Sequence, residues 1–176
     1  MLKLLDVGAG KFPISKGIKT KKTIKLDGVK DNNPDICCDI TKGIPLKDES
    51  LDGIIAGELL EHIYNPFKLT KEFSRILKKD GIIVISVPNI CSIKNRIKCI
   101  FGELPEYCAE PIDNESYERH IIDYNFKKLK KMFNECGFEI MKKTSNGVIF
   151  HSKLIWPLFL TPFTFGETLI IKAIKK

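Results

Sequence analysis

The sequence predicts an α/β protein with a doubly wound, mostly parallel sheet. Residues 3–7 form a short apolar run that leads into Gly8 and Gly10, which is typical of a strand followed by a tight turn. Strand-like and helix-like segments then alternate up to residue 90, and such alternation favours parallel strands with helices on both faces. The nearly unbroken apolar run at 82–87 is typical of a strand that is covered on both sides.

Seven strands are expected in all, in a Rossmann-like order. The predicted strands are residues 3–7, 23–27, 35–39, 51–57, 82–87, 138–142 and 167–173. The first five fit the alternating parallel pattern. The last two follow a helix without another between them, so we expect an antiparallel pair at one edge, with the last strand antiparallel to the rest.

Two amphipathic helices are predicted, at about 66–78 and at 125–136. Each places its apolar residues on one face at helical spacing, and Gly137 is a good helix stop for the second. A turn is expected at 79–81. The connection after Gly10 should hold only about one helical turn, because Pro13 and Gly17 interrupt it.

Two later segments lack a clear pattern. Residues 90–118 carry scattered charge, Cys and Pro, and we interpret them as a variable insertion or lid within a single domain that spans 1–176. Residues 154–163 are apolar and contain two prolines. They fit a packed crossover before the last strand, and they also fit an apolar acceptor pocket, a dimer contact or a membrane-surface patch. The chain could be a monomer or a homodimer.

Composition narrows the class of protein. The formal net charge is +7, but it comes almost entirely from lysine, whereas arginine is the usual bidentate reader of phosphates and guanines. A solvated lysine surface is therefore favoured over nucleic-acid binding. The six cysteines and three histidines show no zinc-ligand spacing, so we expect no metal and buried, reduced thiols in a cytoplasmic protein. No signal peptide or membrane-spanning segment is expected.

The first two strands together predict a nucleoside pocket. Glycines at the end of a strand let the backbone approach a ligand without a Cβ in the way. Asp27 ends the second strand, and an acid at about this distance from the glycines can accept hydrogen bonds from ribose hydroxyls.

Seven segments, in order along the chain, carry a more specific signal. They are Asp6–Gly10, Asp27, Asp39-Ile40, Pro45–Asp52, Glu58–Ile63, Arg75–Gly81, and Pro88-Asn89 with the tail from Arg119-His120 through Gly137-Phe138. In order and spacing they resemble the class I S-adenosylmethionine-dependent methyltransferases, in the type 11 branch that acts mainly on small molecules.

The resemblance implies the cofactor and its contacts. S-adenosylmethionine carries a carboxylate, an ammonium, a sulfonium, a ribose and an adenine. The backbone of Gly8, Ala9 and Gly10 would meet the carboxylate, and Asp6 and Glu58 would face the cationic groups. Asp27 would bind the ribose, and Asp39 with Ile40 the adenine.

Other interpretations of these acids stay open. Asp27 could be a solvated turn residue, Asp39 a helix N-cap, and Glu58 a surface acid that opens a helix.

Methyl transfer is an in-line displacement, for which the protein mainly supplies alignment. A base is needed only for an acceptor such as an un-ionised hydroxyl; His62 and His120 are the candidates, with Glu61 as a further acid, and each could instead be structural. The motifs of adenine, glutamine and cytosine methylation are absent. We therefore expect a small-molecule or lipid- or glycan-linked acceptor.

Two departures from the family pattern keep alternatives open. Phe12 stands at the family's third glycine, and the helices that usually precede the first strand are missing. The site could then be open, covered by 90–118, or completed by a partner. The alternatives are a non-catalytic, cofactor-binding partner subunit, a tRNA or rRNA methyltransferase, and an NAD-binding oxidoreductase, which the missing third glycine disfavours.

Overall fold

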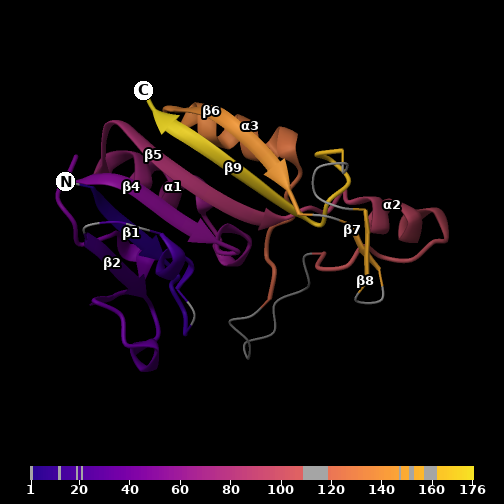
Figure 1. The fold of residues 1–176 in the computed structure, drawn as a ribbon, viewed down its shortest axis with the longest axis horizontal. Helices are drawn as coiled ribbons and strands as arrows, with labels where there is room; N and C mark the ends of the chain where they lie inside the picture. The colour runs from indigo at the N-terminus through magenta and orange to yellow at the C-terminus, as the bar shows by residue number, and fades with distance from the viewer. Residues whose placement is uncertain are drawn as a thin grey trace.

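The computed structural model describes residues 2–11, 13–18, 20, 22–108, 119–146, 148–150, 153–156 and 162–176. Over these residues a 7-stranded sheet has the order β3-β2-β1-β4-β5-β9-β6. Strands β1 to β5 pair in parallel, and β9 is antiparallel to both of its neighbours. This is the predicted doubly wound sheet with an antiparallel last strand (Figure 1).

The strands match the predicted segments, with different ends. They are β1 (Lys3–Val7), β2 (Lys22–Asp27), β3 (Ile36–Cys37), β4 (Leu51–Gly57), β5 (Leu77–Pro88), β6 (Phe138–Ser145) and β9 (Thr168–Lys175). The third strand is shorter than predicted. The turn expected at 79–81 lies inside β5, where Asp80 has a φ of 62°. Gly81 is required there, because a Cβ would come within 2.8 Å of the Lys78 carbonyl oxygen.

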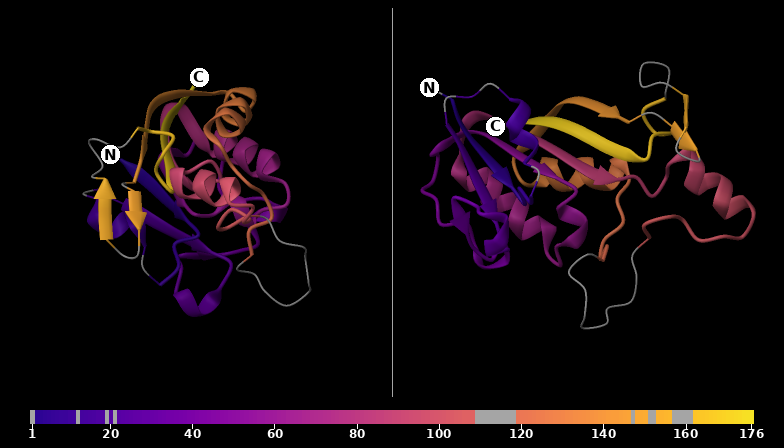
Figure 2. Two further views of the ribbon diagram at one scale, coloured as in Figure 1. Left: turned by 90° about the vertical axis from the view of Figure 1, so that its right-hand side faces the viewer. Right: turned by 60° about the horizontal axis from the view of Figure 1, so that its bottom comes forward.

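Both predicted helices are confirmed, as α1 (Pro66–Ile76) and α3 (Phe126–Glu135). Each begins at an asparagine whose side chain accepts a hydrogen bond from a backbone N–H of the first turn, 2.9 Å away in both cases. They bury their apolar faces completely at Phe73 and Phe133. The right-hand view of Figure 2 shows the two helices together below the sheet.

Single helical turns follow the first strands at their carboxyl ends. They are η1 (Ile14–Gly17), η2 (Lys30–Asn32), η3 (Ile40–Lys42) and η4 (Leu60–His62). The short η1 agrees with the single turn predicted there. It lies on the other side of the sheet from α1 and α3 (Figure 2) and packs on β4, since a Cβ at Gly57 would collide with the Ile14 side chain.

An eight-residue helix that the sequence analysis did not predict, α2 (Ile93–Ile100), lies in the segment interpreted as an insertion. Asn89 connects the start of this segment to the residues just before β9, because its Nδ2 donates to the carbonyl oxygens of Gly166 (2.8 Å) and Thr164 (3.2 Å). Figure 1 shows α2 beyond the carboxyl end of β5, and a small antiparallel pair, β7 (Val148–Phe150) and β8 (Lys153–Trp156), lies at the same end of the sheet.

The apolar segment 154–163 is therefore not an irregular crossover throughout. Its first three residues belong to β8, and residues 157–161 lie outside the described part. Phe163, near its end, packs edge-on against Phe126 with ring centroids 4.9 Å apart. Residues 109–118 of the expected lid also lie outside the described residues.

The cysteines are free, as expected, but only Cys136 is buried, whereas Cys37 and Cys99 are exposed. The prediction of buried thiols is thus wrong for these two. Among the helices that the structure describes, none is both long and apolar enough to cross a membrane.

Candidate active site

The turn after β1 is fastened to the end of β2. Gly8 and Gly10 have φ angles of 67° and 55°, which glycine adopts without strain. The N–H groups of Gly8 and Ala9 donate to the Leu26 carbonyl oxygen at 2.9 and 3.2 Å, and that of Gly10 donates to Asp27 Oδ2 at 2.8 Å. We call residues 8–10 together with Asp27 the cofactor turn.

Asp27 shapes this turn with both of its oxygens. Its Oδ1 accepts a hydrogen bond from the Val29 N–H at 2.8 Å, and the side chain is buried. A solvated turn acid would instead be exposed. Each carboxylate oxygen retains a further lone pair, so Asp27 can still accept hydrogen bonds from a ligand at the carboxyl edge of the sheet.

Asp6, one strand position before the turn, faces the protein interior. It is 1% exposed, and its Oδ2 accepts a hydrogen bond from the Ser15 N–H at 2.9 Å. Its Oδ1 has no hydrogen-bond partner within the described residues. Asp6 therefore holds η1 against the end of β1, and one buried oxygen remains for a ligand.

Asp39 has the geometry of the N-cap alternative. Its Oδ1 accepts hydrogen bonds from the Thr41 N–H (3.0 Å) and the Thr41 hydroxyl (2.6 Å), and these bonds lower the pKa of Asp39. The carboxylate is solvent-exposed, whereas the neighbouring Ile40 packs against the core. The two residues thus present a polar and an apolar group beyond β3.

Glu58 follows β4 in a strained backbone conformation. Its φ is 46°, a left-handed value that costs energy in a non-glycine residue and is often found at functional sites. The Glu58 N–H donates to the Ser86 carbonyl oxygen at 3.1 Å. Glu58 is exposed; partial desolvation nevertheless raises its pKa, while Ser86 and the two histidines oppose the shift.

The cofactor turn and the segment after β4 are in direct contact. A Cβ on Gly8 would lie 3.1 Å from the Leu59 side chain, so the two loops leave no room for a larger residue between them. Because β1 and β4 are neighbouring parallel strands, Glu58 and the cofactor turn both lie at the carboxyl ends of the strands.

His62 and His120, the two candidate bases, lie together although they are distant in the sequence. Their ring centroids are 5.0 Å apart. His62 Nδ1 lies 2.9 Å from the Arg119 carbonyl oxygen, and His120 Nδ1 lies 3.0 Å from that of Tyr107. A carbonyl oxygen can only accept, so each Nδ1 carries the proton and each Nε2 keeps its lone pair in the neutral ring.

Glu61 is the buried neighbour of these rings. It is 1% exposed, neither carboxylate oxygen has a hydrogen-bond partner in the described part of the chain, and Oε1 lies 3.9 Å from His62 Nε2. Burial raises the pKa of Glu61 to about 8. We call Glu61, His62 and His120 the Glu–His cluster. From the sequence alone, Glu61 is predicted only as a further acid beside the two candidate bases.

The Glu–His cluster is closed by the chain that follows the insertion. The backbone oxygen of Glu61 accepts hydrogen bonds from the N–H groups of Ile121 and Ile122 at 2.7 and 3.2 Å. This pair of bonds fixes the segment that carries His120 over η4, which explains how His120 reaches His62.

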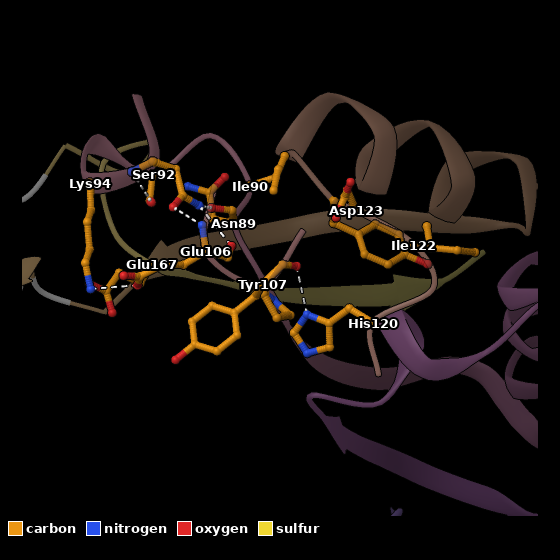
Figure 3. Close-up of a pocket in the computed structure, with 13 residues that line it drawn as sticks. Asn89, Ile90, Ser92, Lys94, Glu106, Tyr107, His120, Ile122, Asp123 and Glu167 are labelled. Atoms are coloured by element: carbon orange, nitrogen blue, oxygen red, sulfur yellow. Dashed lines mark hydrogen bonds and ion pairs between the residues drawn. The ribbon is translucent and has the colours of Figure 1, made fainter. Parts of the chain in front are cut away.

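A pocket opens beside His120 (Figure 3). Its lining residues are Pro88, Asn89, Ile90, Ser92, Lys94, Asn95, Glu106, Tyr107, His120, Ile122, Asp123, Tyr124 and Glu167. Lys94 and Glu106 form an ion pair at 2.6 Å on one side, and Tyr107 lies next to His120 in Figure 3. Sequence reasoning missed Lys94, Glu106 and Tyr107, because they lie in the segment without a regular pattern.

Comparisons with known proteins agree with this geometry. Residues 5–85 match the family model described as a methyltransferase domain. The chain is 29% identical over 146 residues to an uncharacterized protein of Methanocaldococcus jannaschii (80% of this chain and 65% of that one). It is 32% identical over 119 residues to demethylmenaquinone methyltransferase of Alkalihalophilus pseudofirmus (60% of this chain and 49% of that one). The chain thus spans about half to two thirds of the length of these relatives.

Solved structures share the fold. The chain superposes on a SAM-dependent methyltransferase from Thermotoga maritima with a TM-score of 0.73 and 18% identity, covering 99% of this chain and 82% of that one. The sheet order, the cofactor turn and the match over residues 5–85 make the chain similar to the class I S-adenosylmethionine-dependent methyltransferases. The cofactor of that family is S-adenosylmethionine.

Proposed function

We propose that this chain transfers a methyl group from S-adenosylmethionine to a small-molecule or lipid- or glycan-linked acceptor bound beside His120. The observation that carries the proposal is that the cofactor turn, Glu58 and the two histidines all lie at the carboxyl ends of the parallel strands. When bound, the cofactor supplies a methyl carbon activated by a sulfonium. The protein has to align the acceptor with this carbon, provide negative charge near the cationic cofactor and, for some acceptors, supply a base.

The residues present fit this cofactor. The left-handed glycines expose backbone without side chains, the buried Asp27 retains lone pairs for a ribose diol, and Asp6 has one oxygen without a hydrogen-bond partner among the described residues. Glu58 adds negative charge at the end of the neighbouring strand, which suits a cationic ligand. Asp39 and Ile40 offer an acceptor and an apolar surface for the adenine.

For a hydroxyl acceptor we propose His120 as the base. The hydrogen bond from His120 Nδ1 to Tyr107 fixes the ring so that Nε2 can accept a proton. That nitrogen would hold the proton that the acceptor hydroxyl loses when the bound cofactor supplies its methyl group and leaves as S-adenosylhomocysteine. His62 lies close enough to His120 to take the same role.

The acceptor class rests on the pocket and on one relative. The pocket is lined by both charged and apolar side chains, and its cavity volume of about 10 Å³ admits about one water molecule, so an acceptor ring or head group requires the lining residues to move apart. The relative named demethylmenaquinone methyltransferase supports an acceptor of small or lipid-linked type. The motifs of adenine and cytosine methylation have no counterpart in the sequence, which disfavours a tRNA or rRNA substrate.

The first experiment is calorimetric titration with S-adenosylmethionine and S-adenosylhomocysteine, with NAD as a comparison. We expect both sulfur compounds to bind and NAD not to bind. Asp27→Ala should weaken binding by about 1–3 kcal/mol, because ribose hydrogen bonds are lost, whereas Asp31→Ala at an exposed position nearby should not change it. Equal affinities of the two variants would contradict the assignment of Asp27.

Turnover is tested separately by mass spectrometry with a panel of phenols, catechols, quinols and amines. Formation of S-adenosylhomocysteine together with a methylated acceptor supports the enzyme. Cofactor binding without turnover across the panel supports the alternative of a non-catalytic partner subunit. His120→Ala should lower turnover and leave cofactor affinity unchanged; a fully active variant would remove His120 as the base.

A further inference from the structure

The Glu–His cluster has the composition of a metal site. One donor atom from each of Glu61, His62 and His120 lies within 4.8 Å of those of the other two. Two imidazoles and one carboxylate are a common ligand set for divalent transition metals, and they leave further positions open. We propose that this cluster binds a divalent transition metal ion.

The unpartnered carboxylate is the strongest observation. Glu61 is 1% exposed, yet no hydrogen bond reaches either of its oxygens from the part of the chain that the structure describes. A buried acid without hydrogen bonds costs several kcal/mol in general unless it is paired or bound to a metal. A cation placed between Glu61 and the imidazoles would compensate for this burial.

The histidines are oriented as metal-binding histidines usually are. Both use Nδ1 to donate to a backbone carbonyl oxygen, at 2.9 Å from His62 and 3.0 Å from His120. Such a bond fixes the tautomer and leaves Nε2 as the ligand atom. A single histidine held in this way would have little weight, but here two neighbouring rings share the arrangement.

The distances between the three ligand atoms are only slightly longer than those around a bound ion. Ligand atoms about 2.1 Å from a tetrahedral ion are about 3.4 Å from one another, and Glu61 Oε1 is already 3.9 Å from His62 Nε2. Side-chain rotation of Glu61 or a small shift of His120 provides the difference.

The ligand set also indicates which ions fit. Imidazole nitrogen favours Zn²⁺, Co²⁺ and Fe²⁺, whereas Mg²⁺ and Ca²⁺ prefer sites made of oxygen atoms alone. If the proposed function holds, an ion with open positions beside the pocket would hold the acceptor hydroxyl and lower its pKa, and His120 Nε2 would then be a metal ligand instead of the base. The binding of the ion itself does not depend on methyl transfer.

The test uses Co²⁺ alone, added to the full chain after chelation and dialysis. We expect one ion to bind per chain, with visible absorption bands of nitrogen and oxygen ligation and without the charge-transfer band of thiolate ligation. Zn²⁺ should displace it, and Mg²⁺ at the same concentration should not. A thiolate signature would assign the ion to the cysteines and overturn the proposal.

Variants identify the ligands. Glu61→Gln keeps the size of the side chain and removes its charge, so it should still fold; thermal unfolding without metal checks this. Its affinity for Co²⁺ should fall by more than about 100-fold, since even residues behind a ligand contribute about 10–100-fold. His120→Ala should show a similar loss. Glu103→Gln, at an exposed glutamate outside the cluster, is the matched control.

Equal Co²⁺ affinity of the unmodified chain and Glu61→Gln would overturn the proposal. The readout requires neither S-adenosylmethionine nor an acceptor. A failed turnover assay with intact Co²⁺ binding would therefore count against the proposed function alone, and absent Co²⁺ binding with normal cofactor binding would count against the metal site alone.

Discussion

Asp27 and Glu61 are both buried carboxylates at the carboxyl edge of the same sheet, but their surroundings differ. Asp27 accepts one backbone N–H on each oxygen, from Gly10 and Val29. Glu61 accepts none within the described residues. The cofactor turn is therefore complete without a ligand, whereas the Glu–His cluster has buried polar atoms left over. Buried polar atoms without hydrogen bonds lower the stability of a protein, and such destabilising features often occur at functional sites.

Among the three carboxylates compared here, the largest expected effect is at the cofactor turn. Asp27→Ala should lower the free energy of unfolding by about 3 kcal/mol, because two charge-assisted, partly buried hydrogen bonds are lost. Urea unfolding without ligand measures this change. Asp31→Ala, at an exposed position, should have almost no effect. A loss below about 1 kcal/mol for Asp27→Ala would show that the turn holds its shape without the acid.

The Glu–His cluster should respond in the opposite direction. Glu61→Met replaces the buried acid with an apolar side chain of similar length, so it should raise the free energy of unfolding of the ligand-free chain by about 2 kcal/mol. Glu103→Met, at an exposed site, should not. If Glu61→Met destabilises the chain, Glu61 has a hydrogen-bonding partner in solution and the contrast with Asp27 disappears.

A third carboxylate, Glu72 on α1, binds the loop before β4 and can be compared with the first two. Glu72 accepts hydrogen bonds from Arg75 at 2.9 Å and from the Ile44 N–H at 3.2 Å, and the bonds from Arg75 lower its pKa below the usual 4.5. A lowered pKa stabilises the folded chain above that pH, and the contribution is lost as pH falls through the folded-state pKa.

Glu72→Gln should therefore cost about 1 kcal/mol near neutral pH and almost nothing in strong acid, where the native carboxyl is protonated as well. Urea unfolding of both chains at several pH values measures the difference. A cost that does not change with pH would show that the side chain acts through its shape and not through its charge.

The smallest effect is expected on α2. Ile100 is 79% exposed and Phe101 is 78% exposed, so Ile100→Ser should change the free energy of unfolding by no more than about 0.5 kcal/mol. Leu129→Ala, at a fully buried position on α3, should cost about 2–5 kcal/mol. A loss above 1 kcal/mol for Ile100→Ser would show that another part of the chain covers this surface.

Much of the cofactor side could be predicted because its signals are local. Gly8, Gly10 and Asp27 lie at the ends of adjacent strands, so their types and spacing already imply that they meet. The strands and the two amphipathic helices were readable for the same reason, since each carries its own periodic pattern.

The Glu–His cluster could be predicted only in part. His62 and His120 were candidates singly, but their contact depends on the hydrogen bonds from Ile121 and Ile122 to Glu61, which no local pattern encodes. The helix α2 was missed because its apolar residues Ile97 and Ile100 face solvent, so they do not mark a buried face. Cysteine–histidine spacing could not reveal a site made of a glutamate and two histidines.

The order of strands in the sheet has a consequence for how the chain is made. Strand β6 pairs only with β9 among the described strands, and β9 lies between β5 and β6 although it comes last in the sequence. During synthesis, β6 must therefore wait for the final strand before its backbone can join the sheet. Asn89 likewise has no Gly166 to bind until that stretch has emerged, so this wall of the pocket forms only after the residues that lead into β9 have been made.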